Sequence, residues 1–424
     1  MKASMVIKNI DNLITMKGDN RARRGSEQSK IGLIENGIIA IQGEKIIYVG
    51  KGQLPSHIET DKNTAFISGK GKTISPGLVD SHTHVVHGGS REHELSMKLK
   101  GVPYLDILAG GGGIHSTIKA TRTASFDQLY DQAKKSMDTM LSYGITTVEG
   151  KSGYGVEDFQ TELRQLQVAK KLNEDHHVDL VSTFMGAHAI PMKYKDNPDE
   201  FVDIIINEQI PEVSKRNLAK FCDVFTEEGV FTIDQSRKIL LAARDHGMEL
   251  KIHADEIVSL GGAELAAELG CISADHLIAA SDQGIKAMGE KGVIANVLPG
   301  TSFNLQTGKY ANAKKMIEEN VPLAISTDYN PGSCPTENLQ LIMSFASLIM
   351  KLTPEQVITG VTINGAASLG IEDQVGSIEE GKYADIAIFD AKNLDYIIYH
   401  FGINHIDKVI KKGKLVYEKK NCIS

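Results

Sequence analysis

The sequence predicts an α/β protein in which a (β/α)8 TIM-like barrel is inserted into a small β-sandwich built from both termini. The middle of the chain alternates short apolar strands with longer stretches of helical periodicity, which is typical of βα units and a parallel sheet. The two ends instead carry short β-branched strands joined by Gly-containing turns. The length of 424 residues suits two or three domains or one large barrel.

The terminal strands define the composite sandwich domain. Residues 5–16 and 37–52 read as strands near the N-terminus, and residues 384–390 and 409–418 read as strands near the C-terminus. We expect this domain to comprise residues 1–74 and 378–424, and the barrel to comprise residues 75–377.

The barrel is predicted from βα units, of which the clearest begins at Ser125, a plausible N-cap. Apolar residues then recur at helical spacing until Gly144, a C-terminal stop signal. A doubly wound sheet is the alternative, but the sequence lacks its Gly-rich dinucleotide turn. The eight candidate strands are residues 77–84, 145–152, 180–188, 221–228, 249–256, 271–277, 293–300 and 322–330, a number that matches this barrel.

Composition excludes several classes of function. The formal net charge is −8, whereas a nucleic-acid binder normally carries a basic face. The one dense basic stretch, Arg21, Arg23 and Arg24, is expected to be a solvated loop. No segment approaches the roughly 20 apolar residues of a membrane span. The four cysteines have no paired spacing, which suits a reducing cytoplasm.

Metal-ligating residue types follow the predicted strands at their C-terminal ends, where active sites of this barrel lie. His82 and His84 are two residues apart, so both side chains can face the barrel axis. His253, His276 and Asp328 follow three other strands. Imidazoles and a carboxylate suit a divalent metal such as zinc. A lone buried His is usually a hydrogen-bonded core residue, and His276 fits either a ligand or a residue that orients water.

The predicted chemistry is hydrolysis by metal-activated water. A bound metal lowers the pKa of water from near 16 to about 7, and Glu256 is the carboxylate expected to take the proton. Asp328, as a ligand, can also accept a hydrogen bond from that water. Glu227 is a weaker candidate, equally well read as a solvated acid. Asp255 is expected either to support the residues that contact the metal or to be structural.

Long motifs then identify a resemblance. The segments VDSHTHVVHGGSREHE, EGKSGYG, TFMGAHAIP, LKIHADE, SADHL and STDYNPGSCPTENLQLIM resemble the imidazolonepropionase family of the amidohydrolase superfamily, over nearly the whole chain. The resemblance implies metal ligation by His82, His84, His253 and Asp328, and acid/base catalysis by Glu256, with His276 and Asp328 also catalytic. It implies substrate contacts from Arg91, Tyr154, His188, Glu256, Asn330, Gly332 and Ser333, and a weaker contact from Tyr104.

The implied activity is hydrolysis of the ring amide of 4-imidazolone-5-propanoate to N-formimidoyl-L-glutamate, in histidine degradation. A planar Arg91 fork suits the propanoate carboxylate, although without the resemblance the sequence favours a surface ion pair of Arg91 with Glu92 or Glu94. The fourth strand segment, residues 221–228, lacks the bridging lysine of two-metal relatives. One metal per chain is therefore expected, zinc or iron, in a cytoplasmic homodimer.

Two other functions stay open at this point. One is deamination of an aminated ring by the same metal chemistry, and the other is a non-catalytic scaffold, which would be expected to lose metal ligands. His87, His93 and His115 have no assigned role and are expected to be loop residues.

Overall fold

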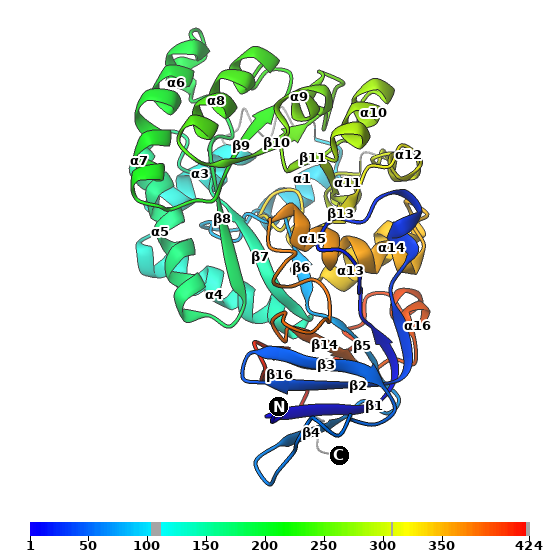
Figure 1. Cartoon of the computed structure of the whole chain (residues 1–424). Helices are drawn as coiled ribbons and strands as arrows, with labels where there is room; N and C mark the ends of the chain where they lie inside the picture. Colours follow the sequence, from blue (N-terminus) through cyan, green and yellow to red (C-terminus); the bar gives the residue numbers. More distant parts are fainter. Residues whose placement is uncertain (103–111, 307, 421–424) are drawn as a thin grey trace.

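The computed structural model describes residues 1–102, 112–306 and 308–420, which form a barrel above a separate sheet (Figure 1). Within these residues the barrel is a parallel sheet in which the strands follow one another in chain order. Each of the eight predicted segments overlaps one of its strands. They are β6 (Leu78–Asp80), β7 (Ile145–Lys151), β8 (Asp179–Ala187), β9 (Phe221–Thr226), β10 (Glu249–Ala254), β11 (Ser273–His276), β12 (Ile294–Val297) and β13 (Leu323–Ile325).

Helices surround the barrel on its outer side (Figure 1). The described helices are α1 (Leu95–Leu99), α3 (Ile114–Thr123), α4 (Phe126–Ser142), α5 (Phe159–Asp175), α6 (Pro198–Ile204), α7 (Ile210–Lys215), α8 (Ile233–Asp245), α9 (Gly262–Leu269), α10 (Asp282–Lys291), α11 (Pro299–Asn304), α12 (Ala313–Glu318), α13 (Leu339–Leu348), α14 (Pro354–Gly360), α15 (Ile363–Ser368) and α16 (Leu394–Tyr399). Shorter turns are the 3-10 helices η1 (Gly25–Ser29), η2 (Glu92–Glu94) and η3 (Met192–Tyr194) and the π-helix η4 (Ile205–Gln209). No described helix is long and apolar enough to cross a membrane.

Helix α4 shows why the local sequence folds as predicted. Ser125 caps it by accepting a hydrogen bond from the Gln128 amide, and Gln128 completes a capping box. The apolar residues of one face, including Met137 and Met140, are buried. Gly144 follows with φ +91°, and a Cβ there would lie 2.6 Å from Ile406 Cδ1. The turn into β7 therefore requires glycine.

The barrel closes between the segments that follow its first and last strands. Thr83 and Tyr329 form a parallel bridge. The Asp328 amide donates to the His82 carbonyl at 3.0 Å, and the His84 amide donates to the Tyr329 carbonyl at 2.8 Å. This closure places the His82–His84 segment directly beside Asp328.

The terminal segments form one mixed sheet of strand order β16-β15-β14-β5-β1-β2-β3, with β4 paired to β1. Its strands are β1 (Met5–Ile14), β2 (Leu33–Gln42), β3 (Lys45–Lys51), β4 (Ala65–Ser68), β5 (Thr73–Pro76), β14 (Ile386–Phe389), β15 (Ile406–Lys411) and β16 (Lys414–Glu418). The N-terminus and the described end of the C-terminal segment, which follows β16, lie at this sheet (Figure 1). The predicted fold class, a (β/α)8 TIM-like barrel with a small β domain formed from both termini, is confirmed. The strands described for the predicted β-sandwich belong to one mixed sheet, and the exact domain bounds stay a prediction.

Alternation along β14 joins the two parts. Ile386 and Ile388 belong to the core of the terminal sheet, whereas Ala387 and Phe389 pack into the barrel core. Strand residues alternate between faces, so β14 has an apolar neighbour on each side. The terminal sheet is therefore a support for the barrel rather than an appendage.

A buried ion-pair cluster reinforces this junction. Lys411, 3% exposed at its side chain, lies with Nζ 2.5 Å from Asp385 Oδ2 and 2.7 Å from Asp179 Oδ2. Lys412 Nζ reaches the other Asp179 oxygen at 2.9 Å. Asp179 begins barrel strand β8, whereas Lys411 ends terminal strand β15 and Lys412 follows it. Charge pairing therefore joins the two sheets.

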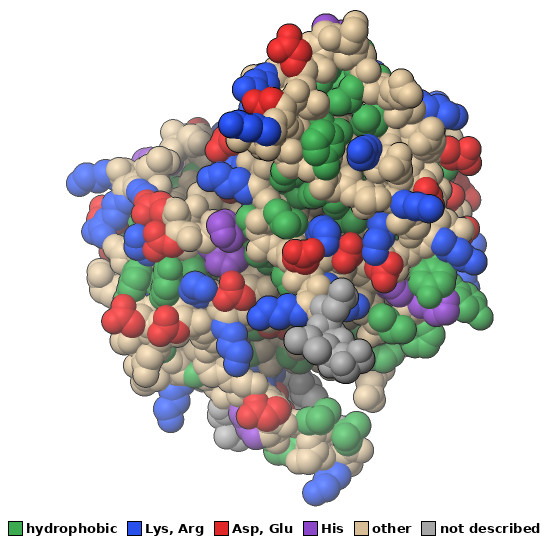
Figure 2. Space-filling model, turned by 90° about the horizontal axis from the view of Figure 1, so that it is seen from below, with side chains coloured by type: hydrophobic (Ala, Val, Ile, Leu, Met, Phe, Trp, Pro, Cys, Tyr) green, Lys and Arg blue, Asp and Glu red, His purple; other side chains and the backbone are tan. Residues whose placement is uncertain are grey.

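The surface seen from below, on the side of the terminal sheet, mixes lysine and arginine with acidic side chains and shows no single-sign field (Figure 2). The prediction of a solvated arginine loop is wrong for Arg23, which is buried. Its guanidinium donates to the Asp19 and Met16 carbonyls, and its amide donates to Asn364 Oδ1 at 2.7 Å. Arg23 therefore fastens the N-terminal segment to α15, a long-range contact that local composition does not reveal.

Candidate metal centre and active site

The three imidazoles proposed as metal ligands are held in one orientation. The Nδ1 atoms lie 2.6 Å from Asp275 Oδ2 for His82, 3.0 Å from Asp223 Oδ2 for His253 and 3.3 Å from the Ser152 carbonyl for His84. Carboxylate and carbonyl oxygens only accept, so each Nδ1 carries the proton and each Nε2 keeps a lone pair. This arrangement is typical of metal-binding histidines.

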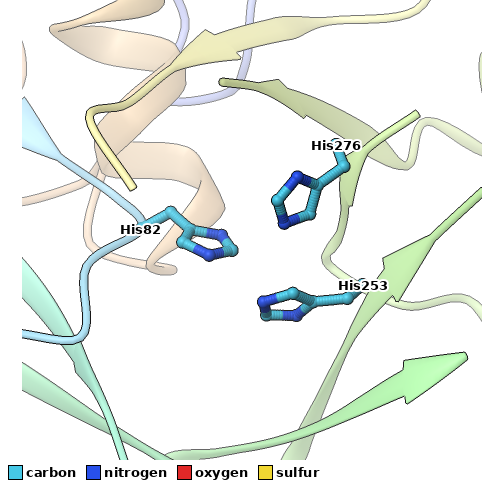
Figure 3. A group of neighbouring side chains, drawn as sticks. All are labelled: His82, His253 and His276. Carbon is cyan, nitrogen blue, oxygen red and sulfur yellow. The ribbon is translucent and has the colours of Figure 1, made fainter. Parts of the chain in front are cut away.

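The rings of His82, His253 and His276 converge from three segments of the barrel (Figure 3). Their centroids lie 4.6 to 5.5 Å apart. Asp328 Oδ1 lies 3.5 Å from His82 Nε2 and 3.8 Å from His84 Nε2. Nitrogen and carboxylate atoms of these residues form two overlapping groups compact enough to hold a metal ion, both of which include His82.

The donor set fits a divalent metal. His82 Nε2 is buried and has no hydrogen-bond partner among the described residues, although buried polar atoms are normally paired. Burial lowers the pKa of His82, His84 and His253 well below the ordinary histidine value, which keeps them in the neutral form that ligates metals. A cation that accepts these lone pairs would satisfy the unpaired nitrogen.

Asp328 combines burial with backbone strain. Burial raises its pKa to about 6, and Thr301 Oγ1 donates to its Oδ2 at 2.5 Å. Its φ is +56°, and His276 has φ +74°, both in the left-handed region that non-glycine residues rarely adopt. Such strain is concentrated at functional sites. At His276 it lets two consecutive residues, Asp275 and His276, both reach the site.

The proposed acid/base pair lies beside the imidazole cluster. Glu256 Oε1 is 3.7 Å from His276 Nδ1, and the Glu256 side chain is 16% exposed, so it is open to substrate and water. The loop that carries Glu256 is fixed by Glu227, whose carboxylate accepts from the Ile257 amide at 2.8 Å and the Val258 amide at 3.3 Å. The reading of Glu227 as a solvated acid is wrong, because it is 2% exposed.

Asp255 has the structural role expected for it. Its Oδ1 accepts from the amides of Leu260, Gly261 and Gly262, and its Oδ2 accepts from the Ala263 amide. The carboxylate therefore satisfies free N–H groups at the start of α9. Although the two residues are adjacent, Asp255 caps the start of α9 and Glu256 lies in the candidate active site.

Tyr154 and His188 form an aromatic wall against the metal cluster. The His188 ring stacks on His84 with centroids 5.2 Å apart, and the Tyr154 ring lies 5.6 Å from His188. His188 Nδ1 lies 2.9 Å from the Gly153 carbonyl and so donates to it. Burial lowers the pKa of His188 to about 4. Its Nε2 is therefore an unprotonated acceptor.

Arg91 forms the ion pair and also reaches the site. Its Nε and Nη2 lie 3.0 and 2.9 Å from the two oxygens of Glu94, and the pair is largely buried, with side chains 10% and 0% exposed. The remaining Nη1 packs on Gly332, where a Cβ would lie only 2.0 Å away. The predicted ion pair with Glu94 is therefore confirmed, but its predicted place at the surface is wrong, because the pair is largely buried.

The turn after Asp328 is folded by Asn330. Its Nδ2 donates to the Asp328 carbonyl and to Ser333 Oγ, both at 2.7 Å. Its Oδ1 accepts from the Gly332 and Ser333 amides, both at 2.8 Å. The side-chain amide of Asn330 therefore shapes the turn that supports Asp328 and Arg91. Tyr104 lies outside the described residues.

Sequence reasoning missed a cluster of buried charges beneath the imidazoles. Its members lie on strands β7, β9, β10 and β11 and are 0–1% exposed: Glu149, Lys151, Asp223, Lys251 and Asp275. Charged residues inside otherwise apolar strands are rare unless paired, and that signal is present in the sequence. His87, expected in a loop, is buried with Nδ1 3.0 Å from Gln132 Nε2.

Fold and site together define a metal-dependent hydrolase. The profile of the amidohydrolase family matches residues 73–416. Among solved structures, an adenosine deaminase from Xanthomonas campestris with bound zinc has a TM-score of 0.68 at 18% identity, covering 98% of this chain and 93% of its own. Zinc-complexed atrazine chlorohydrolase from Arthrobacter aurescens has a TM-score of 0.66 at 18% identity, covering 98% and 95%. At such identities these two structures support the fold alone.

Curated relatives match end to end. The imidazolonepropionase of Alkaliphilus metalliredigens is 60% identical over 423 residues, covering 100% of both chains. That of Fusobacterium nucleatum is 52% identical, covering 99% of this chain and 100% of the other, and that of Streptococcus sanguinis is 49% identical, covering 99% of both. The chain therefore belongs to the amidohydrolase family, and within it to the imidazolonepropionases.

Proposed function

We propose that this site hydrolyses the ring amide of 4-imidazolone-5-propanoate to N-formimidoyl-L-glutamate, a step of histidine degradation. The observation that carries the proposal is the convergence of neutral imidazoles and Asp328 beside the Glu256–His276 pair. Relatives named imidazolonepropionase, 49 to 60% identical over the full chain, support this substrate.

His82, His84, His253 and Asp328 would hold one divalent metal, zinc or iron. When bound, such a metal lowers the pKa of water to about 7 and supplies hydroxide at neutral pH. Imidazole and carboxylate ligands accept both metals. His276 is left outside this set because its Nδ1 faces Glu256 at 3.7 Å, which suits a residue that orients the carboxylate.

Substrate orientation falls to Arg91, Tyr154 and His188. The Arg91 guanidinium binds the propanoate carboxylate through a charge-assisted hydrogen bond, with Gly332, Ser333 and the Asn330 turn behind it. The bare Nε2 of His188 accepts a hydrogen bond from a ring N–H of the imidazolone. Holding the ring at both ends makes the attack of water effectively intramolecular.

Proton transfer falls to Glu256. Its carboxylate takes a proton from the attacking water, which adds to the ring carbonyl carbon. It then delivers the proton to the ring nitrogen as the C–N bond breaks. The products are the formimidoyl nitrogen and a carboxylic acid, which releases its remaining proton to solvent and becomes a carboxylate. His276 and Asp328 flank the reacting centre, where His276 stabilises the developing negative charge.

The decisive experiment follows the ultraviolet absorbance of imidazolone propanoate with purified protein, with and without a chelator. We expect chelator-sensitive loss of substrate and formation of N-formimidoyl-L-glutamate. A parallel panel of aminated ring compounds tests deamination by ammonia release. Ammonia from that panel, together with an inert imidazolone, would contradict the proposal.

We also propose a cytoplasmic homodimer. The described cysteines Cys222, Cys271 and Cys334 are free and buried, which suits a reducing compartment. Light scattering after size-exclusion chromatography tests the dimer, since a dimer doubles the chain mass of 46.1 kDa.

A further inference from the structure

A layer of buried charge lies directly beneath the imidazole cluster. It contains three carboxylates and two ammonium groups, all inaccessible to solvent: Glu149, Asp223, Asp275, Lys151 and Lys251. TIM-barrel interiors are usually filled by layers of branched apolar side chains. Buried ions are costly to desolvate, so their presence here calls for a role that an apolar layer could not serve.

Lys151 is the centre of this layer. Its Nζ lies 2.7 Å from Asp223 Oδ2, 3.0 Å from Glu149 Oε1 and 3.3 Å from Asp275 Oδ2. An ammonium group has three donors, and here three carboxylates surround it. Glu149 is held in turn by Thr183 Oγ1, which donates to Oε1 at 2.5 Å.

Two of the three carboxylate oxygens around Lys151 Nζ are the ones that orient the imidazoles. Asp223 Oδ2 accepts from His253 Nδ1, and Asp275 Oδ2 accepts from His82 Nδ1. The second oxygens are also fixed, since Asp223 Oδ1 accepts from the His253 amide at 3.1 Å and Asp275 Oδ1 accepts from Ser273 Oγ at 2.8 Å. One lysine therefore contacts the orienting partners of two imidazoles at once.

We propose that Lys151 is the positioning residue of the metal centre, which holds Asp223 and Asp275 so that His82 and His253 both present an unprotonated Nε2. Without Nζ, both carboxylates lose a shared cationic partner and can rotate or draw apart. Each imidazole then loses the fixed acceptor that selects its tautomer. The proposal rests on the metal site of the proposed function but not on the identity of the substrate.

Lys251 supplies a matched control. It is equally buried, and its Nζ lies 3.1 Å from Glu149 Oε2. Within the described residues, no ion pair or hydrogen bond joins it to Asp223 or Asp275. Lys251→Met thus removes a buried ammonium group from the same layer without removing a hydrogen bond or ion pair to either orienting carboxylate, on which Lys251 acts only through its charge at longer range.

The test combines metal affinity with a spectrum of metal-free protein. Removing one outer partner of a metal-bound His usually weakens binding 10- to 100-fold. Because Lys151 serves two such partners, Lys151→Met should weaken Zn²⁺ binding by about 100-fold or more in competition with a chromophoric chelator. Lys251→Met should stay within about threefold of wild type. A circular dichroism melt of each metal-free variant checks that the fold is retained.

Proton-detected ¹⁵N spectra of histidine-labelled, metal-free protein report the tautomers directly. In wild type, His82 and His253 should show a proton on Nδ1, and in Lys151→Met both signals should shift toward mixed tautomers. Should Lys151→Met fail to fold, Lys151→Gln, which keeps a neutral donor, has the same predicted direction of change in both measurements.

Three outcomes would overturn the proposal: equal loss of metal affinity in the Lys151 and Lys251 variants, unchanged tautomers in a folded Lys151 variant, or wild-type His82 and His253 protonated on Nε2. The last requires no variant at all. None of these readouts involves turnover, so a wrong substrate assignment would leave them unaffected.

Discussion

Gly332→Ala tests whether Arg91 positions the substrate. Glycine is required at this position because the Arg91 side chain packs against it, and not because the backbone there has a positive φ. A Cβ at Gly332 would lie 2.0 Å from Arg91 Nη1 and 2.9 Å from Arg91 Cζ. Gly332 does not have a positive φ, so alanine can adopt its backbone conformation. The severe clash involves the end of one side chain, and Asn330 Oδ1, at 3.3 Å from the added Cβ, has to shift by only a few tenths of an ångström. The fold should therefore survive.

The size of the effect follows from these distances. Ordinary contact begins near 3.4 Å, so the guanidinium must move by about 1.4 Å, while Glu94 holds Nε and Nη2 from the other side. A displacement of about 1 Å can lower a rate 100-fold, and a hydrogen bond to a charged group contributes about 1.5–3 kcal/mol. We therefore expect kcat/KM to fall by about 10- to 100-fold, mainly through KM.

The assay is steady-state loss of imidazolone absorbance, together with a melting curve and metal analysis, both of which should match wild type. Arg91→Lys removes the planar fork and with it the clash. In that background, Gly332→Ala should have little further effect, the non-additivity expected of residues in contact. An unchanged kcat/KM, or the same loss in both backgrounds, would refute the role given to Arg91.

The remaining predictions concern catalysis, stability and metal. Glu256→Gln should retain metal and lower kcat by about 10²–10⁴-fold; turnover near wild type would exclude Glu256 as the acid/base. Lys411→Met leaves buried Asp385 without its lysine and should lower the free energy of unfolding, measured by urea denaturation, by about 3–5 kcal/mol. Lys408 lies on the same strand but pairs with the exposed Glu418, so Lys408→Met should lower it by about 0–1 kcal/mol. Although burial opposes ionisation of Asp179, Lys411 and Lys412 hold its pKa below the ordinary value. The ionised Asp179 carboxylate therefore stabilises the fold at pH values above its pKa in the unfolded chain. This stabilisation is lost as the pH falls through the pKa of Asp179 in the folded protein. Stability should therefore depend less on pH below about 4 in Lys411→Met; an equally steep acid loss would contradict this. Chelation should abolish activity, and Zn²⁺ or Fe²⁺ should restore it; activity that survives complete metal removal would rule out the metal mechanism.

Much of the fold could be predicted because its signals are local. Each barrel strand is a short apolar segment, and the helix after Ser125 carries its own cap and stop. The candidate ligands could be found for the same reason, since they follow strand ends and the barrel brings those ends together. His82 and His84 are two apart in an extended segment, so one rule of alternation places both.

Contacts between distant segments could not be predicted in this way. The spacing of Arg91 and Glu94 shows that they can pair, but nothing local shows that the third nitrogen of Arg91 packs on Gly332. The amide of Asn330 looks like a ligand contact in sequence, yet it makes four hydrogen bonds within its own turn. Arg23 looks solvated and is buried against α15.

The buried charge layer is partly predictable from the sequence. Its contacts join distant segments, but the alternation of side chains along each strand indicates which residues belong to it. Glu149 and Lys151 are two apart on β7, and Lys251 and His253 are two apart on β10, so each pair points to one side of its strand. On β10, the residue at the strand end belongs to the metal cluster and the one before it to the charge layer below. The rule fails at Asp275 and His276, which are adjacent and both reach the site because His276 has φ +74°. A strained backbone thus supplies the imidazole that faces Glu256 without removing the carboxylate that orients His82, and regular strand geometry would have allowed only one of the two.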